Sequence, residues 1–243
     1  MNAIETKKLT KKYKDKTAVN GIDLEVGEGE LFALLGVNGA GKTTTVRMLS
    51  CLSEPTSGEA FVKGHSVIGD KAAVKRIIGI SPQDTAVAEN LTVRENLEFM
   101  AKVCGYDKAK VKERADEMTE MFGLAEVLNS RAKTLSGGWK RKLSIAMAII
   151  GEPELLFLDE PTLGLDVLAR RELWKSISTL KGRITIVLTT HYMEEAEELS
   201  DRIAIMINGN IEAVGTLSEI EADAGTKGLE NAFVAIAERS MNK

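Results

Sequence analysis

Long apolar runs alternate with segments of helical spacing along most of this chain. The runs cover residues 31–35, 77–80, 155–158 and 184–188. A strand that helices cover on both faces reads as such a run, because neither face meets water. After the first run, apolar residues recur on one side of a helix expected over residues 43–52; they are Val46, Leu49 and Leu52. The pattern predicts an α/β fold with a mostly parallel sheet.

Shorter elements with turn residues between them open and close the chain. Residues 3–32 read as short strands with turns at Asn20-Gly21 and at 27–30, and residues 58–67 as a short strand pair. A hairpin is expected over residues 202–215. Two short helices follow it, and the second should pack down through three apolar side chains, Leu229, Phe233 and Ile236. We therefore expect an N-terminal antiparallel β region beside the parallel sheet.

The stretch from residue 90 to residue 150 shows helical spacing and no strand pattern. Its first helix is expected to begin with Asn90 or Thr92 as the cap. The next, over residues 107–122, has apolar residues on one face and charges on the other; the apolar ones are Val111, Ala115, Met118 and Phe122. A further helix should run from Trp139 to about Ile150. This stretch is therefore expected to form a helical subdomain inserted into the sheet.

Composition and charge narrow the classes of function. Of the 243 residues, 44% are hydrophobic and 28% are charged, which is typical of a globular protein. The formal net charge of −4 includes no basic excess, so no nucleic-acid partner is expected. Cys51 and Cys104 lack the spacing of a metal site, and without a signal peptide both are read as reduced, packed thiols in a cytosolic protein. No apolar run approaches the ~20 residues that span a bilayer.

A glycine-rich loop, residues 36–43, stands between the first apolar run and the first helix. Glycines allow backbone N–H groups to converge on an anion, and the start of the helix adds the positive end of its dipole. Lys42 can then reach the terminal phosphates of a nucleotide, and the Thr43 hydroxyl can ligate Mg²⁺. Strand, loop and helix together predict a nucleotide-binding phosphate loop.

Polar residues follow three other buried strands. Asp159 and Glu160 end one of them, as expected of an acid that holds Mg²⁺ and an acid that polarises the attacking water; the alternative is that two acids merely cap a strand. His191 follows another strand and can face the γ-phosphate. Gln83 lies just past a third, where ligands bind in open α/β sheets, although a lone glutamine there is usually only a polar loop residue.

Two further features have both a functional and an ordinary interpretation. Ser136-Gly137-Gly138 has the form of a second anion site at a helix start, or of a simple N-cap. A second cradle makes sense if it serves the nucleotide of a neighbouring molecule. Tyr13 stands among six lysines of residues 7–16, where its ring can stack on a purine or simply lie on a solvated surface.

With these motifs in this order, the chain resembles the ATP-binding subunits of ABC transporters over nearly its whole length. The resemblance implies a phosphate-loop ATPase core of residues 1–86 and 151–217. It also implies that the inserted helical subdomain, residues 87–150, carries the signature motif, and that residues 218–243 form a short C-terminal helical extension. In this family two subunits, identical or different, form a head-to-tail dimer around two MgATP. The dimer drives a separate permease from the cytoplasmic face of the membrane.

The resemblance also assigns roles to residues. Catalysis falls to Glu160, His191 and Gln83, and Mg²⁺ binding to Thr43, Gln83 and Asp159. Gln83 would further couple the site to a groove that receives the permease. ATP binding is assigned to the following residues: Tyr13, Gly36, Val37, Asn38, Gly39, Ala40, Gly41, Lys42, Thr43, Thr44, Ser136, Gly137, Gly138 and Asp166.

The motifs around residues 160–166, 190–196 and 229–233 look most like the exporter branch, which handles drugs, lipids or polysaccharides. Two positions depart from the family pattern: Trp139 stands where many members have glutamine, and Val167 where proline is common. Two alternatives stay open. One is a non-transport relative that acts on ribosomes or DNA, although no second ATPase unit, coiled coil or basic tract is visible. The other is a regulatory module that no longer hydrolyses ATP.

Overall fold

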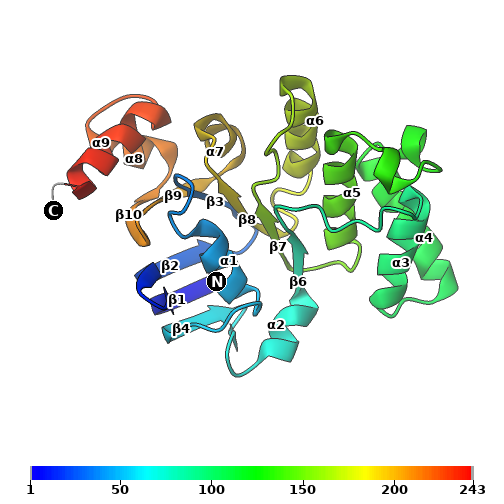
Figure 1. Cartoon of the computed structure of the whole chain (residues 1–243), viewed down its shortest axis with the longest axis horizontal. Helices are drawn as coiled ribbons and strands as arrows, with labels where there is room; N and C mark the ends of the chain where they lie inside the picture. The colour runs from blue at the N-terminus through cyan, green and yellow to red at the C-terminus, as the bar shows by residue number, and fades with distance from the viewer. Residues whose placement is uncertain (1, 242–243) are drawn as a thin grey trace.

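A computed structural model describes residues 2–241 and shows two sheets with helices around them (Figure 1). The larger sheet has the strand order β10-β9-β3-β8-β7-β6. Its members are β3 (Leu31–Leu35), β6 (Ile78–Ser81), β7 (Leu155–Asp159), β8 (Thr185–Thr190), β9 (Arg202–Ile207) and β10 (Asn210–Gly215). The smaller sheet has the order β2-β1-β4-β5. Its members are β1 (Asn2–Tyr13), β2 (Lys16–Gly27), β4 (Ser57–Val62) and β5 (His65–Ser66).

The larger sheet is parallel except at β10, which pairs antiparallel with β9. Every residue of β3, β7 and β8 is buried, which explains why these strands read as unbroken apolar runs. Their carboxyl ends meet at one edge of the sheet, where ligands bind in folds of this kind. The predicted α/β class, with a mostly parallel sheet and an antiparallel N-terminal region, is confirmed.

The antiparallel sheet differs from its prediction in one respect. β1 and β2 are long strands of twelve residues each, not short strands joined by turns. Asn20-Gly21, expected to be a turn, lies inside β2, where the pairing with β1 shifts register between Leu9↔Ile22 and Lys11↔Val19. Gly21 has a φ of 61°, so its positive dihedral serves a β-bulge rather than a hairpin turn. A bulge and a turn require the same residue types, and the sequence pattern does not separate them.

Besides two 3₁₀ helices at Ala125–Val127 and Ala132–Thr134, the described part of the chain contains nine α-helices. They are α1 (Lys42–Leu49), α2 (Lys71–Ile77), α3 (Val93–Val103), α4 (Lys108–Met121), α5 (Gly137–Ile149), α6 (Val167–Ser178), α7 (Met193–Leu199), α8 (Leu217–Ala224) and α9 (Leu229–Met241). The seven-residue helices α2 and α7 were not predicted, because so short a segment shows barely two turns of periodicity. α1 ends earlier than expected, and Leu52, assigned to its apolar face, is 59% exposed.

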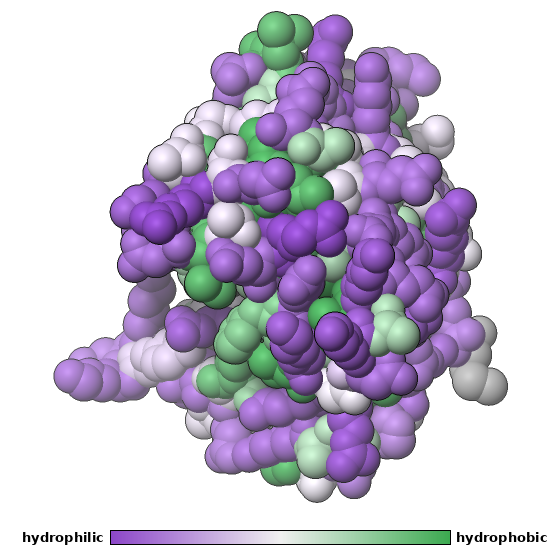
Figure 2. Space-filling model, turned by 90° about the vertical axis from the view of Figure 1, so that its right-hand side faces the viewer, coloured by the Kyte–Doolittle hydropathy of each residue, from purple (hydrophilic) through white to green (hydrophobic). Residues whose placement is uncertain are grey.

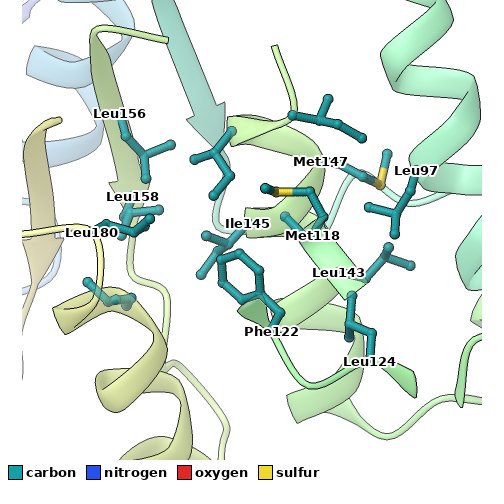
Figure 3. Close-up of a cluster of buried hydrophobic side chains, with 14 of the residues drawn as sticks. Leu97, Met118, Phe122, Leu124, Leu143, Ile145, Met147, Leu156, Leu158 and Leu180 are labelled. Carbon is teal, nitrogen blue, oxygen red and sulfur yellow. The ribbon is translucent and has the colours of Figure 1, made fainter. Parts of the chain in front are cut away.

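The stretch between β6 and β7 is helical, with α3, α4 and α5 packed together (Figure 1). Thr92, not Asn90, caps α3: its hydroxyl accepts from the backbone N–H of Glu95, and the Glu95 carboxylate accepts from the Thr92 N–H. Figure 3 shows side chains of these helices, among them Leu97, Met118 and Phe122, gathered near Leu156 and Leu158 of β7. One apolar core therefore joins the helices to the parallel sheet and fixes α5 relative to the strand ends.

The outer side of the helical region is mostly polar. Figure 2 looks onto the side that carries α3 and α4, and hydrophilic side chains cover most of it, with hydrophobic ones gathered in patches between them. This arrangement agrees with the predicted charged face of α4. Cys104, read from the sequence as a packed thiol, is instead exposed at the end of α3, whereas Cys51 is half-buried, and both are free.

The C-terminal helices α8 and α9 pack on β9, β10 and α7. Leu229, Phe233 and Ile236 are buried there, as their spacing predicts. In the part of the chain that the structure describes, no helix combines the length and the apolar character that crossing a membrane requires.

Candidate functional site

A pocket of about 410 Å³ lies beside the phosphate loop, at the carboxyl ends of β3 and β7. Residues predicted from distant parts of the sequence meet around it. They are Tyr13, Asn38, Gly39, Gly41, Lys42, Thr43, Thr44, Gln83 and Glu160, joined by Lys16, Ala18 and Leu163. The parallel strands create this meeting point, because their carboxyl ends share one edge of the sheet.

The glycines of the loop lie where side chains cannot fit. A Cβ on Gly36 would stand 2.3 Å from the Met206 carbonyl oxygen, and one on Gly41 would stand 2.4 Å from the Ala18 carbonyl oxygen. Gly41 has a φ of 114° and forms the N-cap of α1. The loop therefore keeps its backbone N–H groups at the start of a helix, an arrangement that suits a phosphate.

Not every loop residue lines the pocket. Gly36 and Ala40 are buried beneath it, and the Ala40 N–H donates to the carbonyl of Val37 at 3.1 Å. The Val37 side chain is 52% exposed and points away from the core. These three residues can contribute to nucleotide binding through the shape and the N–H groups of the backbone.

Lys42 is 4% exposed, and its ammonium group lies inside the loop. Nζ donates to the carbonyls of Gly36 at 2.7 Å and Val37 at 3.2 Å, and it lies 3.4 Å from Glu160 Oε1. Burial lowers the pKa of Lys42, while the charges of Glu160 and Asp159 oppose that shift. A phosphate bound near Nζ would supply a negative charge, which would stabilise the buried ammonium group of Lys42.

The residues assigned to Mg²⁺ present oxygen ligands close together. The Thr43 hydroxyl donates to Asp159 Oδ1 at 3.1 Å, and the Thr189 hydroxyl donates to the same oxygen. Gln83, two residues after the end of β6, also lines the pocket. Hydroxyl, carboxylate and amide oxygens are the donors that a hard divalent cation prefers. The set therefore fits Mg²⁺ next to the phosphate loop.

Glu160 and His191 stand side by side. Glu160 Oε2 lies 3.3 Å from His191 Nδ1, without the geometry of a hydrogen bond, and only 7% of Glu160 is exposed. The backbone of Glu160 has a φ of 47°, a left-handed conformation that costs a non-glycine residue of the order of 1–3 kcal/mol. Its N–H donates to the backbone oxygen and the hydroxyl of Thr189 at 3.0 and 3.1 Å. The strained turn aims the carboxylate into the pocket.

Arg141 is a residue of this site that the sequence pattern did not predict. It belongs to α5 and is 4% exposed, and its guanidinium donates to the carbonyl oxygens of Pro82 at 2.6 Å and Gln83 at 2.5 Å. The fork thus ties α5 to the segment that brings Gln83 to the pocket. The position of Arg141, five residues after Ser136 in a helix with a glycine-rich start, was the one signal in the sequence.

Ser136, Gly137 and Gly138 lie outside this pocket, at the start of α5. Figure 1 shows α1 and α5 well apart. Ser136 occupies the N-cap position and is exposed, yet its side chain makes no capping hydrogen bond. The simple N-cap interpretation therefore lacks the bond on which it depends.

The segment that ends in Asp166 lies next to these glycines. A Cβ on Gly138 would stand 3.1 Å from that of Ala169, and one on Gly137 would stand 3.6 Å from Leu165 Cδ2. The Asp166 carboxylate caps α6, because it accepts from the N–H groups of Leu168 at 3.0 Å and Ala169 at 2.9 Å. Asp166 is exposed and does not line the pocket of its own chain.

The aromatic residues at the two edges of the site differ in setting. Tyr13 is 46% exposed at the pocket rim, with Lys11 Nζ 5.1 Å from the ring centre. The ring face can therefore accept a planar group. Trp139 is half-buried, and its ring lies 4.7 Å from Lys142 Nζ, which bonds Glu172 of α6 at 2.9 Å. The pair of Lys142 and Glu172 thus links α5 to α6, with the Trp139 ring beside the lysine.

A larger cavity, of about 650 Å³, lies at the opposite edge of the sheet, near the start of β8. Its buried Arg114 already donates to the carbonyls of Ile149 at 3.2 Å and Ile150 at 2.9 Å. None of the residues that line this cavity belongs to the predicted site.

Comparisons with known proteins agree with this geometry. The family model described as "ABC transporter" matches residues 19–163. The daunorubicin/doxorubicin resistance ATP-binding protein DrrA of Streptomyces peucetius is 44% identical over 225 residues, which cover 92% of this chain and 68% of that protein.

Two solved structures are similar. One is an ATP-binding subunit of an ABC transporter, with a TM-score of 0.86 and 32% identity over 96% of this chain and 99% of that one. The other is the dimeric ATP-binding cassette MJ0796 in a post-hydrolysis state with ADP and Pi, with a TM-score of 0.79 and 27% identity over 88% of this chain and 98% of that one.

Proposed function

The chain belongs to the ABC transporter family as an ATP-binding subunit, and we propose that it hydrolyses MgATP between two subunits to power a separate membrane permease. The observation that carries the catalytic part is the contact of Glu160 with both Lys42 and His191, 3.4 and 3.3 Å away. In this contact, residues from three distant segments meet: Glu160, Lys42 and His191.

The residues around the pocket have distinct tasks in this reaction. The loop N–H groups and Lys42 bind the phosphates, and Tyr13 stacks on the adenine. Glu160 accepts a proton from the attacking water, an effect worth typically 10²–10⁴-fold. His191, beside Glu160, can face the γ-phosphate. Thr43, Asp159 and Gln83 would hold Mg²⁺, which neutralises charge on the β- and γ-phosphates when it is bound.

The second half of each reaction site comes from another subunit. Ser136 and Gly137 are exposed at the start of a 13-residue helix, Gly138 is half-buried, and all three lie outside the pocket of their own chain. In a head-to-tail dimer they face the γ-phosphate bound at Lys42 of the opposite subunit. Asp166, beside them, belongs to the same contact. The similar cassette MJ0796, solved as a dimer in a post-hydrolysis state with ADP and Pi, supports both dimerisation and hydrolysis for this fold.

A membrane permease is the partner that the surface supports. A cavity of about 670 Å³ is lined by apolar side chains near the end of α3 and the start of β6, among them Leu52, Met100 and Val103. Leu52 and Val103 are 59% and 63% exposed. An amphipathic segment of a permease can bury these side chains, which would place the subunit at the cytoplasmic face of the membrane.

Export is the direction that the relatives favour. The similar protein DrrA is named for resistance to daunorubicin and doxorubicin, and removal of such compounds from the cell is an export process. The alternative that acts on ribosomes or DNA has no support among the relatives described above. The alternative without hydrolysis is disfavoured by the paired Glu160 and His191.

Phosphate release tests the hydrolytic part. The wild type should release phosphate from MgATP, and Glu160→Gln should reduce the rate by at least ~10²-fold while nucleotide affinity persists. Glu198→Gln, on the exposed side of α7, is the matched control and should keep the wild-type rate. Equal rates for wild type and Glu160→Gln would remove Glu160 from the mechanism.

A further inference from the structure

Four buried side-chain atoms of residues 2–241 have no hydrogen-bond partner, and all four lie in two short segments, one after Glu160 and one that begins with His191. They are Thr162 Oγ1, Arg170 Nε, His191 Nδ1 and Glu195 Oε2. Buried polar groups are normally paired, and each exception in a native protein calls for a reason. Their concentration in residues 162–170 and 191–195 points to one locus where polar contacts are unfinished.

Glu195 is the most enclosed of these groups. It lies on α7, four residues after His191, and its exposed fraction is 0%. Oε1 accepts from the indole N–H of Trp174, on α6, at 3.1 Å. The nucleotide pocket does not include Glu195, so none of the tasks described above uses it.

The Glu195 carboxyl lies where three functional segments meet. Thr190, immediately before His191, and Thr162, two residues after Glu160, face it closely enough to lower its pKa, as Trp174 does. Thr162 Oγ1 nevertheless makes no hydrogen bond of ordinary geometry. Trp174 belongs to α6, the helix that Asp166 caps.

Burial outweighs these neighbours and raises the pKa of Glu195. A raised pKa favours the neutral acid, whose O–H can donate to a threonine oxygen while the other oxygen keeps the Trp174 bond. Glutamine reproduces that pattern, because its amide donates where the acid would donate and accepts where the acid accepts. Alanine removes the whole group.

We propose that Glu195 is a positioning residue for ATP hydrolysis, which holds the turn after Glu160 and the strand end before His191 in register with α6. Through the Trp174 bond and the burial of the Glu195 carboxyl beside Thr162 and Thr190, α6 and the segments that carry Glu160 and His191 move as one unit. The unfinished contacts at Thr162 leave room for this unit to tighten when a second subunit presses on α6. The proposal rests on the function proposed above.

The test compares Glu195→Ala, Glu195→Gln and Glu197→Ala in steady-state phosphate release. Glu197 is the matched control: it lies on the same helix but accepts from the Leu229 N–H at 2.9 Å and so faces α9. We expect Glu195→Ala to lower kcat by about tenfold or more, because small misplacements of catalytic groups have large effects. The KM for ATP should stay within about twofold, because no nucleotide contact is lost.

Rescue separates positioning from simple stability. Glu195→Gln should return kcat to within about threefold of the wild type, whereas Glu197→Ala should lower the Tm and leave kcat within about twofold. If Glu195→Ala does not fold, Trp174→Phe removes the indole donor while keeping an aromatic ring, and it should still lower kcat by about threefold at constant KM.

An unchanged kcat in Glu195→Ala, or in Trp174→Phe if the former does not fold, would overturn the proposal. So would a Glu195→Gln variant no better than Glu195→Ala. If Glu160→Gln is inactive and the Glu195 series is flat, this inference alone fails. An active Glu160→Gln variant would remove the proposed catalytic role of Glu160 and this inference with it.

Discussion

Two glycine-rich segments of this chain begin helices, yet the structure treats them differently. The loop of residues 36–43 is pressed against backbone carbonyls, and its lysine is almost fully buried beside Glu160. Ser136, Gly137 and Gly138 lie at the start of α5, where Ser136 and Gly137 are exposed and the serine hydroxyl makes no capping bond. The loop of residues 36–43 is therefore packed against its own chain, whereas Ser136 and Gly137 remain exposed.

The difference shows what a single subunit can do. In the buried loop, Lys42 lies beside Glu160 and Thr43 donates to Asp159, so its polar contacts come from its own chain. Within residues 2–241, the Ser136 side chain makes no capping hydrogen bond. We interpret its exposed hydroxyl and the glycine N–H groups as a half-site whose second half another subunit would supply. We therefore propose that the two segments are unlike halves of a reaction site, which an assembly of subunits would join.

The largest effect is expected from Lys42→Ala. The substitution removes the ammonium that meets the phosphates and leaves the buried Glu160 without its nearest cation, so hydrolysis should fall by at least ~10²-fold. Phosphate release and binding of a fluorescent ATP analogue measure it. Lys63→Ala, whose ammonium pairs with Glu28 and Glu154 at the other edge of the sheet, is the control. If Lys42→Ala hydrolyses ATP within about twofold of the wild-type rate, Lys42 does not have the role in hydrolysis assigned to it here.

Ser136→Ala tests the open half. Because Ser136 caps nothing with its side chain, the free energy of unfolding should change by less than ~0.5 kcal/mol. Hydrolysis should nevertheless fall by about tenfold or more, since a donor to the phosphate of the other subunit is lost. Urea unfolding and phosphate release on one preparation decide the matter. A loss of stability with normal turnover would identify Ser136 as an ordinary cap.

Arg141→Lys tests the link between the two halves. Lysine keeps the charge but cannot donate to the Pro82 and Gln83 carbonyls at once, as the arginine fork does. The Gln83 segment should loosen, and turnover should fall by about threefold to tenfold with nucleotide affinity preserved. Steady-state kinetics at several Mg²⁺ concentrations would show it. Wild-type turnover in Arg141→Lys would mean that α5 does not position Gln83.

Thr216→Ala should have the smallest effect on activity and a clear effect on stability. Thr216 forms a complete capping box with Glu219 at the start of α8, so its loss should cost about 1 kcal/mol of unfolding free energy. Phosphate release should stay at the wild-type rate. This cap is the counterpart of Ser136: one hydroxyl stabilises its helix, and the other is free. If Ser136→Ala and Thr216→Ala lower the free energy of unfolding equally, both hydroxyls stabilise their helices and the two residues do not differ as described.

Much of the fold is readable in the sequence, because burial on both faces leaves unbroken apolar runs at β3, β7 and β8. The helical stretch is readable for a different reason: Val111, Ala115 and Met118 recur at helical spacing on one buried face. The bulge at Gly21 and the short helices α2 and α7 were not, since local residue types fit more than one backbone form there.

The site divides in a similar way. Lys42, Asp159, Glu160 and Gln83 follow strands whose ends the topology brings together, so order along the chain predicts their meeting. Arg141 and Glu195 act through buried contacts with segments far away in sequence. A charged residue within a helix is ordinarily exposed, and only packing shows that these two are not. The roles of Ser136 and Asp166 depend on a second subunit and stay predictions.

Light scattering of the Glu160→Gln variant tests the half-site account most directly. At saturating MgATP, slow hydrolysis should trap the assembled form. The mass of the free 26.4 kDa chain should then double, and the complex with its permease should contain two ATP-binding subunits. A chain that stays at 26.4 kDa under saturating nucleotide, and remains a single copy beside the permease with no second ATP-binding subunit, would contradict the account.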